Sequence, residues 1–360
     1  MAPGMPDESS AAAVLTVDHL DVRFATKRGV AHVVRDLSYQ LHAGETLAIL
    51  GESGSGKSVS TLALTKLIPI PPGRVAGHVR IGDHDLVAMA EKELVGYRGA
   101  RIGYVFQDPM TSLNPVHPIG RQVTEGMRFH LGVSEREARE RTVDLLRQVG
   151  IPDAEKRLDD YPHQFSGGMR QRVVIAIGLS CHPDVLVADE ATTALDVTTQ
   201  AQIVELVGRL QDEIGMAVIW ITHDLGVVAG IADRVLVMYA GEVVEEAPVD
   251  LLYATPRHPY TLGLMSSLPV LGDLERRELA AIPGMPPTPL ALPPGCGFHP
   301  RCAYRSDPRC EAEHPALVEV EPGHRVRSFY EVPESDARAA AAAGRIDIEP
   351  PDAAYRSAAS

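Results

Sequence analysis

The stretch of sequence that decides the fold is Gly51-Glu52-Ser53-Gly54-Ser55-Gly56-Lys57-Ser58, which follows a predicted strand at residues 46–50. After this stretch, residues 58–67 favour a helix, and a proline-rich segment ends it. Glycines between a strand and a helix let backbone N–H groups face phosphate oxygens, and the helix start adds positive potential. A lysine at position 57 would neutralise the phosphates, and a serine hydroxyl at position 58 would ligate Mg²⁺. The stretch therefore predicts a nucleotide-binding loop. The alternative is a glycine-rich turn without a ligand.

Two carboxylates follow a second apolar run. Residues 185–188 are all apolar, and Asp189 and Glu190 come directly after them. A short, fully apolar run is typical of a strand in a parallel sheet that is covered on both faces. Asp189 and Glu190 could instead cap the next helix, but this alternative explains one of them better than the pair. Residues 102–106 and 217–221 also favour strands, and Gln107 and His223 follow them.

A third string, Phe165-Ser166-Gly167-Gly168-Met169, opens a helical pattern. Alone it would be an ordinary serine N-cap followed by glycines. Together with the phosphate loop, the glutamine, the Asp-Glu pair and the histidine, however, it resembles the ATP-binding cassette (ABC) family. The resemblance extends from about residue 15 to residue 332. It implies an ATPase that uses ATP and Mg²⁺.

The resemblance gives each motif a role. Asp189 would orient the Mg²⁺ shell together with Ser58 and Gln107. Glu190 would polarise the attacking water, with Gln107 and His223 as the other catalytic residues. In this family the Ser-Gly-Gly string binds the γ-phosphate held by a facing cassette. The residues implied to contact the nucleotide are Gly51, Glu52, Ser53, Gly54, Ser55, Gly56, Lys57, Ser58, Val59, Ser166, Gly167, Gly168, Asp189 and Asp196.

Expected domains follow from these motifs and from composition. We expect an α/β fold, a P-loop ABC ATPase core with a RecA-like, mostly parallel sheet and an antiparallel β subdomain, over residues 14–250. Residues 108–168 are helical in pattern, with Ser134 and Glu137 as a capping box, and predict an inserted helical subdomain. Residues 234–246 predict a closing hairpin across Ala240-Gly241. Residues 251–332 are rich in proline and predict a loop-rich extension outside the main sheet. Residues 1–13 and 333–360 are expected to be disordered, although the alanine-rich tail could also form a loose helix.

Composition limits the partners. The chain of 360 residues has 34 basic and 48 acidic residues, a net charge of −14, which argues against a nucleic-acid binder. No run approaches the roughly 20 apolar residues that a membrane-spanning helix needs. The first thirteen residues lack the pattern of a secretory signal, so we expect a cytoplasmic protein with reduced cysteines.

Further strings, within and after the cassette, make the resemblance more specific. Residues 107–115, 258–264 and 282–287, and the string Cys296-Gly297-Phe298-His299-Pro300-Arg301-Cys302, resemble the ATP-binding subunits of bacterial oligopeptide and dipeptide importers. In that subfamily four cysteines can hold an iron–sulfur cluster. Here Cys296, Cys302 and Cys310 fit a [4Fe-4S] cluster, but Ser328 stands where the fourth cysteine is expected. A zinc ion held with a histidine, or free thiols, are the alternatives.

The sequence therefore predicts the ATPase subunit of a peptide importer at the cytoplasmic face of the inner membrane. Because one chain carries one phosphate loop and one Ser-Gly-Gly string, a second ATPase subunit, identical or different, must complete each site. Two integral-membrane permease subunits and an extracytoplasmic substrate-binding protein are the other implied partners. An importer of nickel or glutathione, and a soluble ABC ATPase without a transport role, remain as alternatives.

Overall fold

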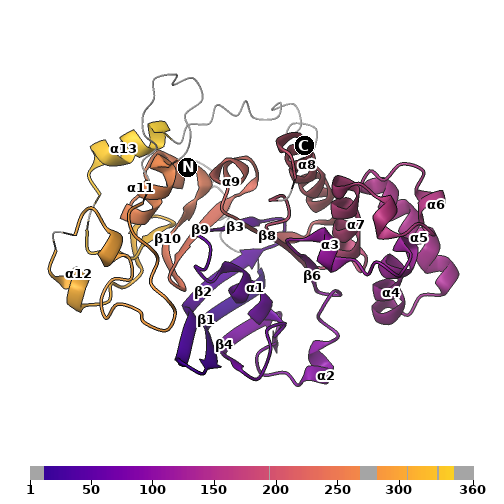
Figure 1. Cartoon of the computed structure of the whole chain (residues 1–360), viewed down its shortest axis with the longest axis horizontal. Helices are drawn as coiled ribbons and strands as arrows, with labels where there is room; N and C mark the ends of the chain where they lie inside the picture. Colours follow the sequence, from indigo (N-terminus) through magenta and orange to yellow (C-terminus); the bar gives the residue numbers. More distant parts are fainter. Residues whose placement is uncertain (1–11, 194, 268–281, 306, 331, 344–360) are drawn as a thin grey trace, which may run out of the picture. The chain divides into compact units, whose positions relative to one another are not determined.

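The computed structural model describes residues 12–193, 195–267, 282–305, 307–330 and 332–343 (Figure 1). The chain forms two compact units. The first unit contains residues up to Phe24, Val34–Leu47 and Ser58–Ile221. The second unit contains Ala25–Val33, Ala48–Lys57 and the residues from Thr222 on. No helix in the described ranges is long and apolar enough to cross a membrane.

Most residues of an antiparallel sheet with the strand order β2-β1-β4-β5 belong to the first unit. Strand β1 (Ala13–Thr26) pairs with β4 (Gly73–Ile81), and β4 pairs with β5 (His84–Asp85). Alternate residues of β1 and of β2 (Gly29–His42) are buried, as the alternating sequence predicts for a sheet with one covered face. The short helix α2 (Glu91–Leu94) follows β5.

A parallel arrangement in the same unit carries the residues of interest. Strand β7 (Val185–Asp189) lies between β6 (Ile102–Val105) and β8 (Ala217–Thr222) and is parallel to both. Nearly all residues of these strands are buried, which explains their continuous apolar sequence. Because parallel strands end at the same edge of a sheet, the residues after β6 and β7 lie close together.

The predicted helical subdomain is present. It contains α3 (Pro109–Ser112), α4 (Ile119–Leu131), α5 (Glu135–Gln148), α6 (Ala154–Arg157) and a 3₁₀ turn, η1 (Pro162–Gln164). Figure 1 shows α4, α5 and α6 grouped beside α7 (Gly167–Leu179). The hydroxyl of Ser134 accepts a hydrogen bond from the Glu137 N–H at 3.2 Å, which is one of the two hydrogen bonds of the predicted capping box. Helix α8 (Val197–Ile214) follows β7.

The second unit contains the predicted hairpin. Strands β9 (Arg234–Tyr239) and β10 (Glu242–Pro248) pair antiparallel, and Ala240 and Gly241 form the turn with positive φ angles of 50° and 87°. One expectation was wrong. Part of the proline-rich extension does not lie outside the sheet, because β12 (His324–Val326) pairs with β10, and β11 (Val318–Glu321) pairs with β12.

Strand β3 (Thr46–Leu50) and several short helices are the next elements. Strand β3 precedes the predicted phosphate loop, and α1 (Lys57–Leu64) follows it. Helices α9 (Leu225–Ile231), α10 (Val249–Ala254), α11 (Pro259–Ser266), η2 (His299–Arg301) and α12 (Arg309–Ala312) belong to the second unit.

The tail differs from the expectation of disorder in its first part. Residues Glu334–Ala343 form helix α13, which packs against α10 and α11. Ala337 and Ala340 on this helix are almost completely buried in the apolar core of the second unit. Small side chains let the helix approach its neighbours closely, so the alanine-rich composition serves packing here. Residues 1–11 and 344–360, also expected to be disordered, lie outside the described residues.

Candidate nucleotide site

Residues 51–57 of the predicted phosphate loop, residues 51–58, belong to the second unit. Lys57 is almost completely buried, and its Nζ donates to the carbonyl oxygens of Gly51 (2.6 Å) and Glu52 (3.0 Å). Glycine is required at two positions of the loop. A Cβ on Gly51 would lie 2.3 Å from the carbonyl oxygen of Met238, and Gly56 has a φ of 103°. A larger residue at either of these two positions would therefore not fit this loop conformation.

The loop is suited to bind phosphate groups. The hydroxyl of Ser55 is buried and has no hydrogen-bond partner in the part of the chain that the structure describes. A buried hydroxyl without a partner is costly, so it indicates a ligand. The backbone of the same residue is held on both sides, since its N–H donates to the Glu52 carbonyl (3.2 Å) and its carbonyl accepts from the Gly241 N–H (2.9 Å). These residues fit the nucleotide that the sequence predicts.

The first unit brings together the residues expected to handle the metal ion and the water. The Ser58 hydroxyl donates to Asp189 Oδ1 at 2.9 Å, and the Gln107 side-chain amide donates to Glu190 Oε2 at 2.7 Å. Thr193 Oγ1 lies 3.4 Å from the same Glu190 oxygen. Since β6 and β7 are parallel neighbours, Gln107 and the two carboxylates leave the sheet at one edge. Hydroxyl, carboxylate and amide oxygens are the ligands that Mg²⁺ prefers, so Ser58, Asp189 and Gln107 fit this ion.

The backbone at Glu190 adopts a conformation that non-glycine residues rarely take. Its φ is 48°, and its N–H donates to the Ile221 carbonyl of β8 at 3.0 Å. A left-handed backbone at such a residue costs about 1–3 kcal/mol and is found most often at functional sites. No pattern in the sequence indicates this conformation. Its effect is to place the carboxylate of Glu190 beside Gln107.

The Ser-Gly-Gly string opens helix α7, as predicted. Ser166 is the N-cap, and its hydroxyl accepts from the Met169 N–H at 3.3 Å. A Cβ on Gly167 would meet nothing within 4 Å, whereas a Cβ on Gly168 would lie 3.0 Å from Thr199 Cγ2. Packing within this chain therefore explains a glycine at position 168 but not at position 167.

Asp196 and His223 complete the predicted set. Asp196 is exposed and caps α8, and its hydrogen bonds with the hydroxyl (2.7 Å) and N–H (3.0 Å) of Thr199 lower its pKa. His223 is exposed in the second unit, one residue before Asp224, which caps α9. Asp196 belongs to the first unit and His223 to the second.

The structure does not support a metal centre at the cysteines. Within the described residues, no group of three or more His, Cys, Asp or Glu side chains is placed to hold a metal ion. Burial raises the pKa of Cys296 and Cys310, and it raises the pKa of Cys302 to about 11. The three cysteines form no disulfide, and their arrangement supports neither the expected [4Fe-4S] cluster nor the alternative zinc ion. Ser328, which stands in place of a fourth cysteine, donates its hydroxyl to the Tyr330 carbonyl at 3.1 Å.

Sequence reasoning missed two residues that contact the phosphate loop. Arg301 forms an ion pair with Glu52, and the Tyr260 hydroxyl accepts a hydrogen bond from the Glu52 N–H. Both residues lie in strings that the sequence singled out for their resemblance only. Their local spacing carries no signal of a contact with a loop more than 200 residues away.

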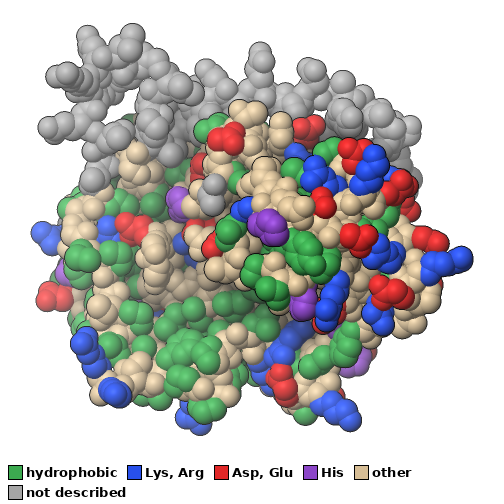
Figure 2. Space-filling model, turned by 45° about the vertical axis from the view of Figure 1, so that its right-hand side comes forward, with side chains coloured by type: hydrophobic (Ala, Val, Ile, Leu, Met, Phe, Trp, Pro, Cys, Tyr) green, Lys and Arg blue, Asp and Glu red, His purple; other side chains and the backbone are tan. Residues whose placement is uncertain are grey.

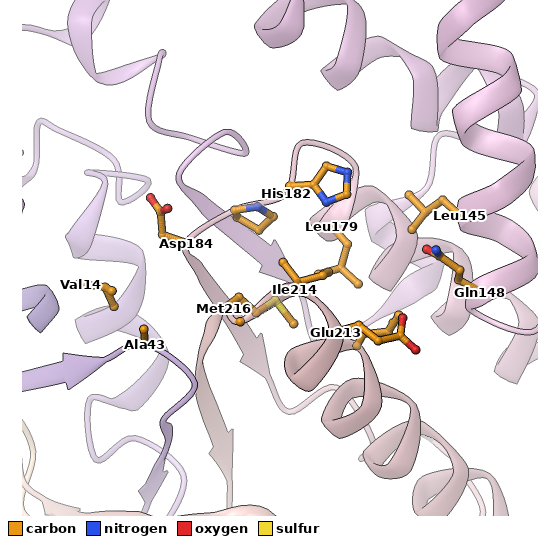
Figure 3. A pocket seen from close by; sticks show the side chains of 13 residues that line it. Val14, Ala43, Leu145, Gln148, Leu179, His182, Asp184, Glu213, Ile214 and Met216 are labelled. Atoms are coloured by element: carbon orange, nitrogen blue, oxygen red, sulfur yellow. The ribbon is translucent and has the colours of Figure 1, made fainter. Parts of the chain in front are cut away.

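The first unit also contains a pocket of about 640 Å³, which lies away from the predicted catalytic residues (Figure 3). Asp184 and Met216, which directly precede β7 and β8, line it together with Glu213 and Ile214 at the end of α8. It is therefore at the opposite ends of these strands from Asp189, so it is separate from the predicted catalytic residues.

Comparisons with known proteins agree with the motifs. The family model described as ABC transporter matches residues 34–193, and the one described as oligopeptide/dipeptide transporter, C-terminal region, matches residues 244–310. The oligopeptide transport ATP-binding protein OppD of Bacillus subtilis (strain 168) is 48% identical over 341 residues, covering 94% of this chain and 92% of OppD. The dipeptide transport ATP-binding protein DppD of Escherichia coli (strain K12) is 46% identical over 318 residues, covering 88% of this chain and 97% of DppD.

A solved structure has the same core. The dimeric structure of the ATP-binding cassette MJ0796 in a post-hydrolysis state, bound to ADP and Pi, superimposes with a TM-score of 0.59 at 27% identity. This likeness covers 65% of the present chain and 98% of that cassette. The mixed α/β architecture is therefore that of a P-loop ABC ATPase. With relatives this similar over nearly their whole length, the chain belongs to the ABC transporter family.

Proposed function

We propose that this protein hydrolyses ATP to power the import of dipeptides or oligopeptides through a membrane permease. The observation that carries this proposal is the paired arrangement in which Ser58 contacts Asp189 and Gln107 contacts Glu190. The likeness to OppD and DppD, which includes the C-terminal extension, supports peptides as the cargo.

Each residue of the site has a distinct task in this proposal. Bound Mg²⁺ would neutralise charge on the phosphates, and Ser58 and Asp189 would hold it. Lys57 would bind the β- and γ-phosphates. The Glu190 carboxylate would accept a proton from the attacking water, and Gln107, which already contacts Glu190, would orient that water. His223 would contact the γ-phosphate.

A second cassette, identical or different, completes the site. Ser166 and Gly167 are exposed at the start of α7, and none of the described residues packs against the position of a Gly167 Cβ. A glycine costs helix stability, so its presence here needs another reason. Contact with the γ-phosphate of a facing cassette is such a reason, since the N-terminus of α7 attracts anions. The dimeric cassette MJ0796 is consistent with this arrangement.

The permease subunits would dock beside Gln107. Apolar side chains are exposed around α3 and α4: Phe106, Met110, Val116 and Phe129 have exposed fractions between 41% and 71%. Such a group of exposed apolar residues indicates a protein contact. Lys and Arg side chains are interspersed with Asp and Glu across the face that Figure 2 shows, which is unlike a nucleic-acid surface.

A direct contact links the proposed docking surface to the Ser-Gly-Gly helix. The Arg170 guanidinium in α7 contacts the Met110 sulfur in α3, and its Nε donates to the Pro162 carbonyl at 2.8 Å. A displacement of α3 by a permease would therefore move the start of α7. In the assembled importer, we place the protein at the cytoplasmic face of the inner membrane. Two permease subunits and an extracytoplasmic substrate-binding protein complete the system.

Uptake by a reconstituted importer tests the proposed function. The chain, candidate permeases and a candidate binding protein from the same organism, and any second ATPase subunit would be placed in vesicles with labelled di- and pentapeptides. We expect ATP-dependent peptide uptake that Lys57→Ala abolishes. Uptake of nickel or glutathione in place of peptides would change the assigned cargo. ATP hydrolysis that never couples to these permeases would favour a soluble ABC ATPase.

A further inference from the structure

Arg301 in the C-terminal extension pairs with a carboxylate inside the phosphate loop. Its Nη1 lies 2.6 Å from Glu52 Oε2, and its Nη2 lies 3.0 Å from Glu52 Oε1. This is a bidentate ion pair, the strongest geometry available to arginine. The Arg301 side chain is 4% exposed and that of Glu52 is 30% exposed. The pair is therefore largely withdrawn from water, where it is screened less than a surface pair.

The second unit holds the Arg301 guanidinium in a fixed position. Its Nε donates to the Pro283 carbonyl at 2.9 Å, and the group lies 5.7 Å from the centroid of the Tyr239 ring. The Tyr239 hydroxyl is 3.4 Å from Nη1. The hydrogen bond with Glu52 is the main reason that the pKa of Arg301 is raised, so the group stays charged. A guanidinium held on several sides loses little freedom when it binds a carboxylate.

The backbone of Glu52 is held from the extension as well. Its N–H donates to the hydroxyl of Tyr260 at 2.8 Å. Tyr260 is completely buried. The centroid of its ring lies 4.7 Å from that of the Tyr239 ring and 5.4 Å from that of the Phe298 ring. The carbonyl of the same glutamate accepts from Lys57 Nζ. Three groups of the chain thus fix one residue of the loop, and two of them come from the extension.

A carboxylate in this loop works against its expected ligand. ATP carries several negative charges on its phosphates, and Glu52 lies in the loop that would surround them. Like charges at close range in a partly buried site repel each other strongly. A buried arginine on that carboxylate cancels the repulsion and orients the loop at the same time.

We propose that Arg301 is a positioning residue for ATP, which neutralises Glu52 and, with Tyr260, holds the phosphate loop ready for the triphosphate. The C-terminal extension is then part of the nucleotide site. This inference rests on the proposed role of residues 51–58 as the phosphate loop. It assigns the extension a task that does not depend on metal binding.

A double-mutant cycle measures this role directly. The dissociation constant of Mg-ATP would be determined for the purified full chain and for R301Q, E52Q and the double variant. We expect R301Q to bind Mg-ATP at least roughly tenfold more weakly, since removing one partner leaves the other charge uncompensated. E52Q should bind within about threefold of wild type, because it removes the repelling charge. The double variant should recover most of the affinity lost in R301Q.

Controls separate positioning from a loss of folding. Arg309 also lies in the extension, where it pairs with Asp307 at the surface, so R309Q should bind Mg-ATP as wild type does. R301K keeps the charge without the bidentate geometry, and we expect an affinity between those of wild type and R301Q. Tyr260→Phe removes only the hydroxyl and should weaken binding several-fold. If R301Q does not fold, R301K and Tyr260→Phe carry the test, and wild-type affinity in both would overturn the proposal.

Two other results would also overturn it. Wild-type affinity in a folded R301Q would show that the ion pair does not act on the nucleotide. A double variant as weak as R301Q would show that Glu52 does not repel the phosphates, which contradicts the neutralising role. Lys57→Ala distinguishes this failure from that of the proposed function. If it binds Mg-ATP as wild type does, residues 51–58 are not the phosphate loop, and both proposals fail.

Discussion

Replacing Gly167 by alanine separates the folding of this chain from the completion of its proposed composite site. A Cβ at this exposed position meets nothing within 4 Å among the residues that the structure describes. Since Gly167 is the first residue of α7, we expect the free energy of unfolding to change by no more than about 0.5 kcal/mol. In the proposed dimer the same methyl group would be forced against the γ-phosphate of the facing cassette. Overfilling a close contact costs about 1–3 kcal/mol.

That cost sets the expected loss of activity. At 1.4 kcal/mol for each factor of ten, ATP turnover should fall by roughly 5- to 150-fold. Gly208 is the matched control, because it lies inside α8 and a Cβ there also meets nothing within 4 Å. Gly208→Ala should raise the free energy of unfolding by about 0.5–1 kcal/mol, the usual gain in a helix interior, and leave turnover unchanged. The assays are thermal unfolding and steady-state phosphate release.

The outcome tests whether the start of α7 contacts the nucleotide of a facing cassette. Full turnover in Gly167→Ala, measured on a protein as stable as wild type, would refute the contact with a facing nucleotide. A loss of turnover that is accompanied by unfolding would show instead that the glycine serves this chain alone. We expect neither result, because the space around Gly167 is open.

Three further predictions concern single side chains. Ser58→Ala removes the hydroxyl that contacts Asp189, so the Mg²⁺ concentration for half-maximal ATP hydrolysis should rise about tenfold or more, and an unchanged Mg²⁺ titration would contradict its role. Val116→Asp places a charge on the proposed docking surface, where the side chain is 71% exposed; it should leave the stability of the isolated chain within about 0.5 kcal/mol but reduce peptide uptake, and normal uptake would exclude this surface. Burial raises the pKa of Cys302 to about 11, so the rate of its alkylation by iodoacetamide should keep rising with pH up to about 11. Comparison with Cys302→Ser assigns the reaction to this thiol, and a plateau in the rate by about pH 9 would contradict the prediction.

The sequence was sufficient where the deciding residues are neighbours in the chain. The loop at residues 51–58 needs glycines for backbone angles that only glycine adopts readily, so its conformation can be predicted from its sequence. The carboxylates after β7 follow from an apolar strand, and the Ser134 cap follows from a local hydrogen bond. The hairpin at Ala240-Gly241 is likewise a short-range feature.

The sequence was insufficient where contacts are distant or composition is ambiguous. Arg301 meets Glu52 across 249 residues, and neither residue has a local pattern that indicates the other. Strand β12 has three residues, too few for a periodic signal, and it exists because β10 offers it an edge. Alanine-rich α13 has the composition of a solvated helix, and only its packing against α10 and α11 orders it. The three cysteines resembled a cluster site, but within the described residues no group of side chains is placed to hold a metal ion.

The most direct test of the account is the effect of Glu190→Gln on the assembled importer. The substitution keeps the size of the side chain and a hydrogen-bonding oxygen for Gln107, but it removes the base. General-base catalysis contributes about 10²–10⁴-fold, so phosphate release should fall at least about 100-fold while ATP stays bound to the protein. Phosphate release at the wild-type rate by Glu190→Gln would contradict the assignment of this residue as the base and, with it, the proposed mechanism.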